Sequence, residues 1–350
     1  MRKVLGVLLG LVLVGLLAFG ASVPKIALIL ATGGLGDRSF NDQSYWGAER
    51  AAKELAERYG VPVEQIFSYV EPRSIADYEG YQREFARTGE YTIIVCIGFD
   101  QAPVLEEVAP DYPDQKFVVI DAVAAADNVA SVVFNDWEEA FLCGVVAGLW
   151  TKTNKVGMLG GMDIPLIRRF YQGFSQGARW ANPAIKPEDV LVRYVGAWNN
   201  PVLGKELSLE MYQAGADVIY GAAGKSHLGV FAAAEENPGV WWAMGTDVDQ
   251  AWSTPEHADV IIASGLKRVD LAVYTEIMKA VEGTWQPGVI VYGMVSESRI
   301  GTGIAVGKED AFPPYVVASH SLVDIPDWII AKVVEAAKGI LEGTIVIEHE

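Results

Sequence analysis

The 350-residue chain has little of what metal and catalytic sites use most, namely cysteine and histidine. It contains two cysteines and four histidines, and no histidine stands at metal-ligand spacing from either thiol, which argues against a bound metal. Cys96 and Cys143 each lie in an apolar run. We therefore expect free buried thiols, with a disulfide outside the cytosol as the alternative. No cofactor is expected.

Excess positive charge is absent as well. The chain has 27 Lys and Arg against 45 Asp and Glu, a formal net charge of -18. This balance argues against binding to a nucleic-acid backbone, so we expect no nucleic-acid partner. Hydrophobic residues make up 51% of the chain and charged residues 21%, which excludes a disordered protein. The length allows two ordinary domains.

Long apolar runs are missing everywhere except at the N-terminus. Arg2 and Lys3 precede an uncharged apolar run over residues 4–19, and small residues follow. This is the pattern of a secretory signal peptide over residues 1–22. The alternative is an uncleaved anchor, because the run approaches the roughly 20 residues that span a bilayer. The apolar run at 141–150 is too short to span and predicts a buried helix.

The N-terminal pattern predicts a location. We expect export of everything that follows, to the periplasm or the extracellular face of the cell membrane. No cysteine lies near the end of the apolar run, so we expect no lipid-modified cysteine.

Short apolar segments alternate with amphipathic ones from residue 24 onward. Continuously apolar strands separated by helices indicate a parallel sheet that is covered on both faces. For the first half of the chain we predict strands at 25–31, 65–70, 91–97 and 116–121, with helices at 45–59, 75–87 and 102–109.

The same alternation then starts again, so the pattern predicts a second α/β unit. Its predicted strands are 128–134, 155–160, 190–195, 217–220, 240–244 and 260–263, with helices at 137–151, 166–180, 204–214, 229–236 and 266–281. The C-terminal part predicts strands at 304–306 and 315–318 and a helix at 327–341.

The fold class is therefore α/β, with two doubly wound lobes, a cleft between them and strands that cross from one lobe to the other. We expect the crossings at 128–134 and 260–263. The first lobe is predicted to comprise residues 24–128 and about 264–290, and the second residues 129–263 and about 291–350. Ligands of such sheets bind beyond the carboxyl ends of the strands.

The glycine-rich loop after the first strand, TGGLGDRSFND, presents several candidate binding residues. It lacks the Lys-Ser/Thr pair of a nucleotide-triphosphate loop and the third glycine of a dinucleotide loop. Asp37, Phe40 and Asn41 could contact a flat polar ligand. The alternative is structural, with Phe40 packing on the next helix and Asn41 or Asp42 capping it.

Further polar residues follow later strands. Asp100 and Asp121 end two strands of the first unit, where each could bind ligand hydroxyls or cap a turn. The corresponding positions of the second unit are Trp198 and Asn199, residues 221–225 (GAAGK) and residues 245–249 (GTDVD), and Lys267 follows the second crossing. No nucleophile stands with a base in a recognisable motif, so we do not expect an enzyme.

Taken together, these segments resemble the basic membrane protein family of solute-binding proteins. The resemblance covers about residues 24–300 and is carried by GDRSFNDQSYWGAE, GFDQAP, YPDQKFVVIDAV, NVASVVF, EEAFLCGVVAGLWTKTNKVGMLGG, FYQGFSQGAR, YVGAWNN, GADVIYGAAG, LGVFAAAEE, GTDVDQ and KRVDLAVY. It implies a type I periplasmic-binding fold and similarity to the purine-nucleoside receptors of ABC importers. A membrane permease and a purine nucleoside are the implied partners, and we expect a monomer.

The resemblance also implies roles for individual residues. Phe40 matches an aromatic that stacks on the base, with Asn41 beside it, and Trp198 matches the aromatic on the opposite face. The polar positions associated with the sugar or the base edge are matched by Asp121, Asp247 and Lys267, whereas Asp37, Gly224 and Asp100 are expected as cleft neighbours.

Two departures from the family stand out. The lipobox cysteine is missing, and the turn AGKSHLG carries Lys225 and His227, which could alter the choice of ligand. The alternatives are another flat ligand such as a flavin, an exported nucleoside-processing enzyme, or a ligand sensor of the same fold.

Overall fold

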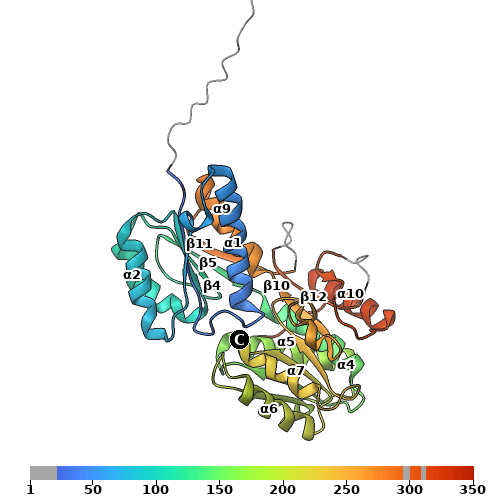
Figure 1. Cartoon of the computed structure of the whole chain (residues 1–350). Coiled ribbons are helices and arrows are strands. Elements are labelled where there is room, and N and C mark those ends of the chain that lie inside the picture. Colours follow the sequence, from blue (N-terminus) through green and yellow to red (C-terminus); the bar gives the residue numbers. More distant parts are fainter. Residues whose placement is uncertain (1–21, 295–299, 309–312) are drawn as a thin grey trace, which may run out of the picture.

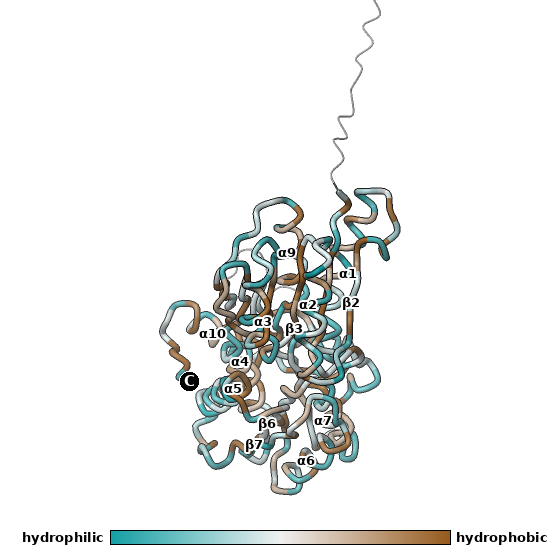
Figure 2. Tube along the Cα trace, turned by 90° about the vertical axis from the view of Figure 1, so that its left-hand side faces the viewer, coloured by the Kyte–Doolittle hydropathy of each residue, from teal (hydrophilic) through white to brown (hydrophobic). Residues whose placement is uncertain are grey.

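The computed structural model describes residues 22–294, 300–308 and 313–350. The predicted signal peptide therefore lies outside the described residues, apart from residue 22. The described chain forms two α/β lobes, one above the other (Figure 1). A quarter turn shows the same division, with β2, β3 and α1 to α3 above and β6, β7, α6 and α7 below (Figure 2).

The first sheet has the order β11-β5-β4-β3-β1-β2, and all its strands run parallel. Its strands are β1 (Ile26–Ile29), β2 (Phe67–Val70), β3 (Ile93–Ile97), β4 (Phe117–Ile120), β5 (Val129–Phe134) and β11 (Gly288–Tyr292). The helices of this lobe are α1 (Phe40–Tyr59), α2 (Tyr78–Thr88), α3 (Ala102–Val108) and α9 (Val269–Glu282). Every residue of β1, β3 and β4 is buried, because helices cover both faces of the sheet.

The second sheet has the order β13-β12-β10-β9-β8-β6-β7 and is parallel except for the β10–β12 pair. Its strands are β6 (Val156–Gly160), β7 (Val190–Tyr194), β8 (Val218–Ala222), β9 (Trp242–Gly245), β10 (Ile261–Lys267), β12 (Thr302–Ala305) and β13 (Val316–Val317). The helices are α4 (Asp136–Trp150), α5 (Pro165–Ala181), α6 (Pro201–Gln213), α7 (Leu228–Ala234), α8 (Gln250–Ser253) and α10 (Asp327–Leu341).

Helix α4 is the buried helix that the run at 141–150 predicted, and it packs between α5, α10 and the second sheet. Four glycines let α4 and α5 approach closely, two from each helix. A Cβ at Gly177 would lie 2.0 Å from the Phe141 carbonyl oxygen, and one at Gly144 would lie 2.1 Å from that of Phe174. Gly148 and Gly173 are equally tight against the facing backbone. The helix pair is therefore packed backbone to backbone, with no room for side chains at these positions.

The crossing points expected from the sequence were wrong. Strand β5 lies wholly in the first sheet and β10 wholly in the second, and the chain passes between lobes just after each of them. Leu266 and Lys267, expected in a helix, form the end of β10 because they pair with β12. Strand β11 was not predicted, and it places residues 288–292 in the first sheet. The expected lobe borders otherwise stay a prediction.

Both cysteines are free and buried, one in β3 and one in α4, as the apolar runs predicted. The alternative of a disulfide between them is thereby wrong. Within residues 22–294, 300–308 and 313–350, no helix combines the length and apolar character needed to cross a bilayer.

Candidate functional site

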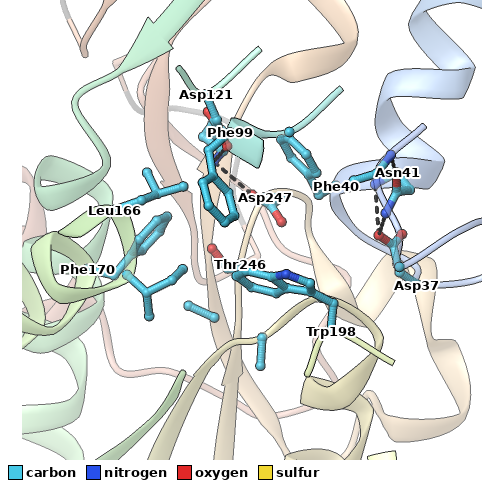
Figure 3. Close-up of a pocket in the computed structure, with 18 of the residues that line it drawn as sticks. Asp37, Phe40, Asn41, Phe99, Asp121, Leu166, Phe170, Trp198, Thr246 and Asp247 are labelled. Atoms are coloured by element: carbon cyan, nitrogen blue, oxygen red, sulfur yellow. Dashed lines mark hydrogen bonds and ion pairs between the residues drawn. The ribbon is translucent and has the colours of Figure 1, made fainter. Parts of the chain in front are cut away.

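All nine residues predicted from the sequence line one cavity between the two lobes (Figure 3). The empty space between its lining residues, including the part that is open to solvent, is about 630 Å³. The nine are Asp37, Phe40, Asn41, Asp100, Asp121, Trp198, Gly224, Asp247 and Lys267. Sequence reasoning missed Phe99, Leu166, Ile167, Phe170 and Thr246, and the rest of the lining consists of alanines and glycines at positions 31, 33, 98, 222 and 223.

Asp37 organises the loop that leads into α1. Its carboxylate accepts hydrogen bonds from the backbone N–H groups of Ser39 (2.9 Å), Asn41 (2.8 Å) and Asp42 (3.1 Å), and from the Asn41 amide (3.1 Å). The N-cap residue of α1 is Ser39, and the free N–H groups of its first turn are bound by the Asp37 side chain, rather than by Asn41 or Asp42 as the structural alternative supposed. With four donors already bound, Asp37 acts on the cavity by fixing Phe40 and Asn41 in place.

Lys267 lies at the centre of a buried charge cluster at the end of β10. Its Nζ is 2.7 Å from Asp121 Oδ2, 3.3 Å from Asp136 Oδ1 and 3.7 Å from Asp247 Oδ1. All four side chains are at least nine-tenths buried. The surplus of carboxylates holds the pKa of Lys267 well above its ordinary value, against the opposing effect of its burial, so its ammonium stays charged.

Three aromatic rings surround the same ammonium. The Lys267 Nζ lies 5.0 Å from the ring centre of Phe40, 5.4 Å from that of Phe170 and 5.8 Å from that of Phe134. Such distances are typical of cation–π contacts. Phe40 comes from the first lobe and Phe170 from the second, so the lysine is held by groups of both.

Two of the carboxylates sit on strained backbone. Asp121 follows β4 with φ 69°, and Asp247 follows β9 with φ 68°. Residues other than glycine rarely adopt this left-handed conformation, and it persists only where the surroundings enforce it. Asp121 Oδ1 is buried and has no hydrogen-bond partner among the described residues. An acceptor oxygen that faces a cavity unpaired is suited to a ligand hydroxyl.

A second tier of acids lies behind the first, on the opening turn of α4. Burial and the charge of nearby Asp121 raise the pKa of Asp136 to about 6, against the opposing effects of Lys267 and Arg169. Burial and the Asp247 charge hold the pKa of Glu139 well above its ordinary value. Thr246 lies 3.4 Å from Glu139 Oε1 and links it to the cavity wall.

This tier predicts how stability depends on pH. Because the pKa of Asp136 is higher in the folded chain than the usual 3.8, the folded state binds the proton more tightly. The free energy of unfolding should therefore rise as pH falls through 6, by about 1 kcal/mol between pH 7.5 and 5.0 for this group. Denaturant unfolding of the wild type and of Asp136→Asn at both pH values measures it.

The Asp136→Asn variant should lose this increment, because it has no proton to bind there. Asp114→Asn, at an exposed position, is the matched control and should follow the wild type. An Asp136→Asn protein with the full wild-type pH dependence would contradict the assignment.

Trp198 forms the floor of the cavity on the second lobe. Its ring packs so closely on Gly161 that a Cβ there would lie 2.3 Å from Trp198 Cζ3. Phe99 of the first lobe points toward it, with ring centres 6.3 Å apart and planes at 63° (Figure 3). Aromatic groups from opposite lobes thus face the same space.

The lobes are closed against each other at the mouth. The Arg38 carbonyl accepts hydrogen bonds from Gln250 Nε2 (3.0 Å) and Ser253 Oγ (2.9 Å) of the other lobe. The rings of Trp46 and Trp252 meet edge to face at 5.4 Å. In the described part of the chain, no three His, Cys, Asp or Glu side chains are arranged to hold a metal ion.

The chain is similar to several known proteins along most of its length. The model of the family Bmp, described as ABC transporter substrate-binding protein PnrA-like, matches residues 24–303. A Pyrococcus abyssi protein named an uncharacterized lipoprotein is 35% identical, over 95% of this chain and 83% of its own. The nucleoside-binding ABC transporter protein BmpA of Lactococcus lactis is 29% identical, over 86% and 87%. A solved ABC transporter solute-binding protein of Aeropyrum pernix K1 has a TM-score of 0.77 and 31% identity, over 93% and 94%.

One comparison corrects the expected location. We expected a protein of the periplasm or the extracellular face without a lipid anchor, but relatives from Pyrococcus abyssi, Pyrococcus horikoshii and Pyrococcus furiosus are all named lipoproteins. The names indicate anchored proteins at the membrane surface, still outside the cytoplasm. The correction concerns only the location. It does not identify a residue that carries a lipid, because residues 1–22 contain no cysteine.

The expected type I periplasmic-binding fold is confirmed by the solved relative, and the expected family by the match over residues 24–303. Substrate-binding proteins of ABC transporters bind a small ligand and work with a membrane permease. The chain belongs to the Bmp family of PnrA-like ABC transporter substrate-binding proteins.

Proposed function

We propose that the protein captures a purine nucleoside between its lobes and delivers it, as a monomer, to a membrane permease. The observation that carries the proposal is the pairing of flat aromatic walls with an unpaired acceptor in one closed cavity. Phe40 and Phe99 face it from the first lobe and Trp198 from the second, next to Asp121. The relative from Lactococcus lactis that is named nucleoside-binding supports the same ligand class.

The two parts of a nucleoside match the two kinds of group in the cavity, the base matching the aromatic rings and the ribose matching the carboxylates. The base offers two flat faces, and stacking contributes about 1–3 kcal/mol per base. The vicinal hydroxyls of ribose donate hydrogen bonds, which are strongest to an ionised carboxylate such as Asp121 or Asp247. Closure of the lobes removes water from both contacts and retains the ligand.

The charge of the cavity supports a neutral ligand. Four carboxylates line it, Asp37, Asp100, Asp121 and Asp247, against the single ammonium of Lys267 among its described residues. Added phosphate groups would meet this surplus of negative charge. The proposal is therefore for the nucleoside rather than its phosphates.

Calorimetry tests the ligand. Adenosine, guanosine and inosine are titrated into the protein, with purine bases, ribose, uridine and riboflavin for comparison. We expect at least one purine nucleoside to bind with a dissociation constant in the micromolar range or below. Binding of riboflavin alone would replace the nucleoside by another flat ligand, and no binding of any purine compound at micromolar concentration would refute the proposal.

Substitution of the aromatic walls tests the stacking. Trp198→Ala and Phe40→Ala should each weaken nucleoside affinity about 10- to 100-fold, because each removes one stacked face. The melting temperature of the ligand-free protein should change little. Trp328→Ala, on the exposed side of α10, is the matched control and should bind like the wild type. A large loss of ligand-free stability with unchanged affinity would assign Trp198 and Phe40 to packing instead.

A further inference from the structure

Three segments of the chain pass between the lobes, and they are bonded to one another. They connect β5 to α4, β10 to α9 and β11 to β12. The backbone N–H of Asn135, in the first segment, donates to the Tyr292 carbonyl at the start of the third (2.8 Å). The N–H of Arg268, in the second, donates to the Gly301 carbonyl (3.0 Å). The relative position of the lobes is therefore determined where these segments meet.

A single buried carboxylate, that of Glu138, binds two of the three segments. It lies on the first turn of α4 and is 8% exposed. It accepts hydrogen bonds from Asn135 Nδ2 (2.7 Å), from the backbone N–H of Met294 (2.8 Å) and from Thr302 Oγ1 (3.1 Å). Hydrogen bonds to an ionised acceptor are about twice as strong as those between neutral groups.

Gly293 lies close against the polar ends of Asn135 and Glu138. A Cβ at Gly293 would lie 2.7 Å from Asn135 Nδ2 and 2.9 Å from Glu138 Oε2. Thr302, which donates to Glu138, is the direct partner of Lys267 in the β10–β12 pair. The hydrogen bond from Thr302 to Glu138 therefore constrains the position of Lys267 through the β10–β12 pair.

We propose that Glu138 is a positioning residue that clamps the crossing segments and holds the lobes in the closed arrangement. Through Thr302 it also fixes Lys267 in line with Asp121 and Asp247. Glu138 does not line the cavity, so it acts on the ligand only through these segments. The evidence for the clamp is the set of contacts in the ligand-free chain. Only the measurement of inosine dissociation described below rests on the proposed nucleoside capture.

Glu138→Gln tests the clamp. The amide has one acceptor oxygen instead of two, so an NH₂ group must face either the Asn135 amide or the Met294 N–H, and the latter cannot turn away. Spin labels at Glu84→Cys on α2 and Glu206→Cys on α6, both exposed, report the distance between the lobes. Pulsed dipolar spectroscopy is run without ligand and with saturating inosine.

We expect the short-distance, closed population to shrink in Glu138→Gln, and inosine to dissociate about tenfold faster, since bonds to a charged acceptor are lost. Glu276→Gln is the matched control, a buried glutamate on α9 that pairs with Lys279 and has no hydrogen bond to the described residues of the crossing segments. It should leave both readouts at wild-type values. Thr302→Val removes one donor of the same clamp and should shift the distance in the same direction.

Distance distributions of Glu138→Gln that match the wild type in both states would overturn the proposal. If Glu138→Gln does not fold, Thr302→Val with unchanged distances overturns it equally. Failure of inosine to bind the wild type would count against the nucleoside only, because the ligand-free distances still decide whether the clamp exists.

Discussion

Lys267→Met should lower the free energy of unfolding at pH 7.5 by about 3–5 kcal/mol, the usual result of removing one partner from a buried ion pair. Three buried carboxylates lie within 3.7 Å of the Lys267 ammonium, and each would lose its nearest positive charge. At pH 5.0 the loss should be smaller. Without the cation the carboxyl pKa values rise, so the folded state takes up protons as pH falls and regains stability. Guanidinium unfolding at the two pH values measures both effects.

Two further variants isolate the cause. Lys279→Met removes the partner of one buried carboxylate, that of Glu276, but its own side chain is 38% exposed, so we expect a loss of about 1 kcal/mol. Adding Asp121→Asn to Lys267→Met removes one uncompensated charge and should restore part of the stability. A Lys267→Met loss no larger than that of Lys279→Met would show that the cluster is not held by its lysine.

Gly177→Ala should destabilise the protein by about 3 kcal/mol, the upper end of what overpacking usually brings. The new Cβ would lie 2.0 Å from the Phe141 carbonyl oxygen, and a backbone atom cannot move aside as a flexible side chain can. Helices α4 and α5 must therefore separate. Because α4 carries Asp136 and Glu139 and α5 carries Phe170, nucleoside affinity should fall with stability.

Gly80→Ala in α2 is the matched control for this prediction. It is also a helical glycine, but nothing lies within 4 Å of its Cβ position. Alanine there should be neutral or stabilise by up to about 1 kcal/mol, since glycine is the weaker helix former. Equal effects of the two substitutions would show that helix propensity, rather than the close approach of α4 and α5, decides the outcome.

The elements that could be predicted are those whose burial follows directly from the hydrophobic pattern of their own sequence. Strands β1, β3 and β4 are apolar throughout and buried throughout, and α10 was predicted at residues 327–341 as observed. Lys267 was misplaced in a helix because the length of β10 depends on pairing with β12, more than thirty residues later. Strand β11 was missed, an edge strand whose valines at 289 and 291 are exposed.

The residues of the site also divide into those that the sequence predicted and those that it did not. The rule that ligands bind beyond strand ends selected the segments, and the family resemblance selected nine residues within them. All nine line one cavity, whereas their roles in binding stay a prediction. Phe170 was missed because it stands on a helix and reaches the cavity only through the packing of α5 on α4. Asp136 and Glu139 were missed because acids in the first turn of a helix are common and carry no mark of a site.

The chain returns to the first lobe after it has formed most of the second, and this connectivity constrains the order of folding. Strand β5 is the edge of the first sheet until β11, residues 288–292, pairs with it, and α9 must return to pack on α1. The N-terminal half therefore leaves the ribosome long before its own sheet can be finished, with an apolar strand edge unpaired. Contacts so distant in sequence slow folding and lengthen exposure to aggregation.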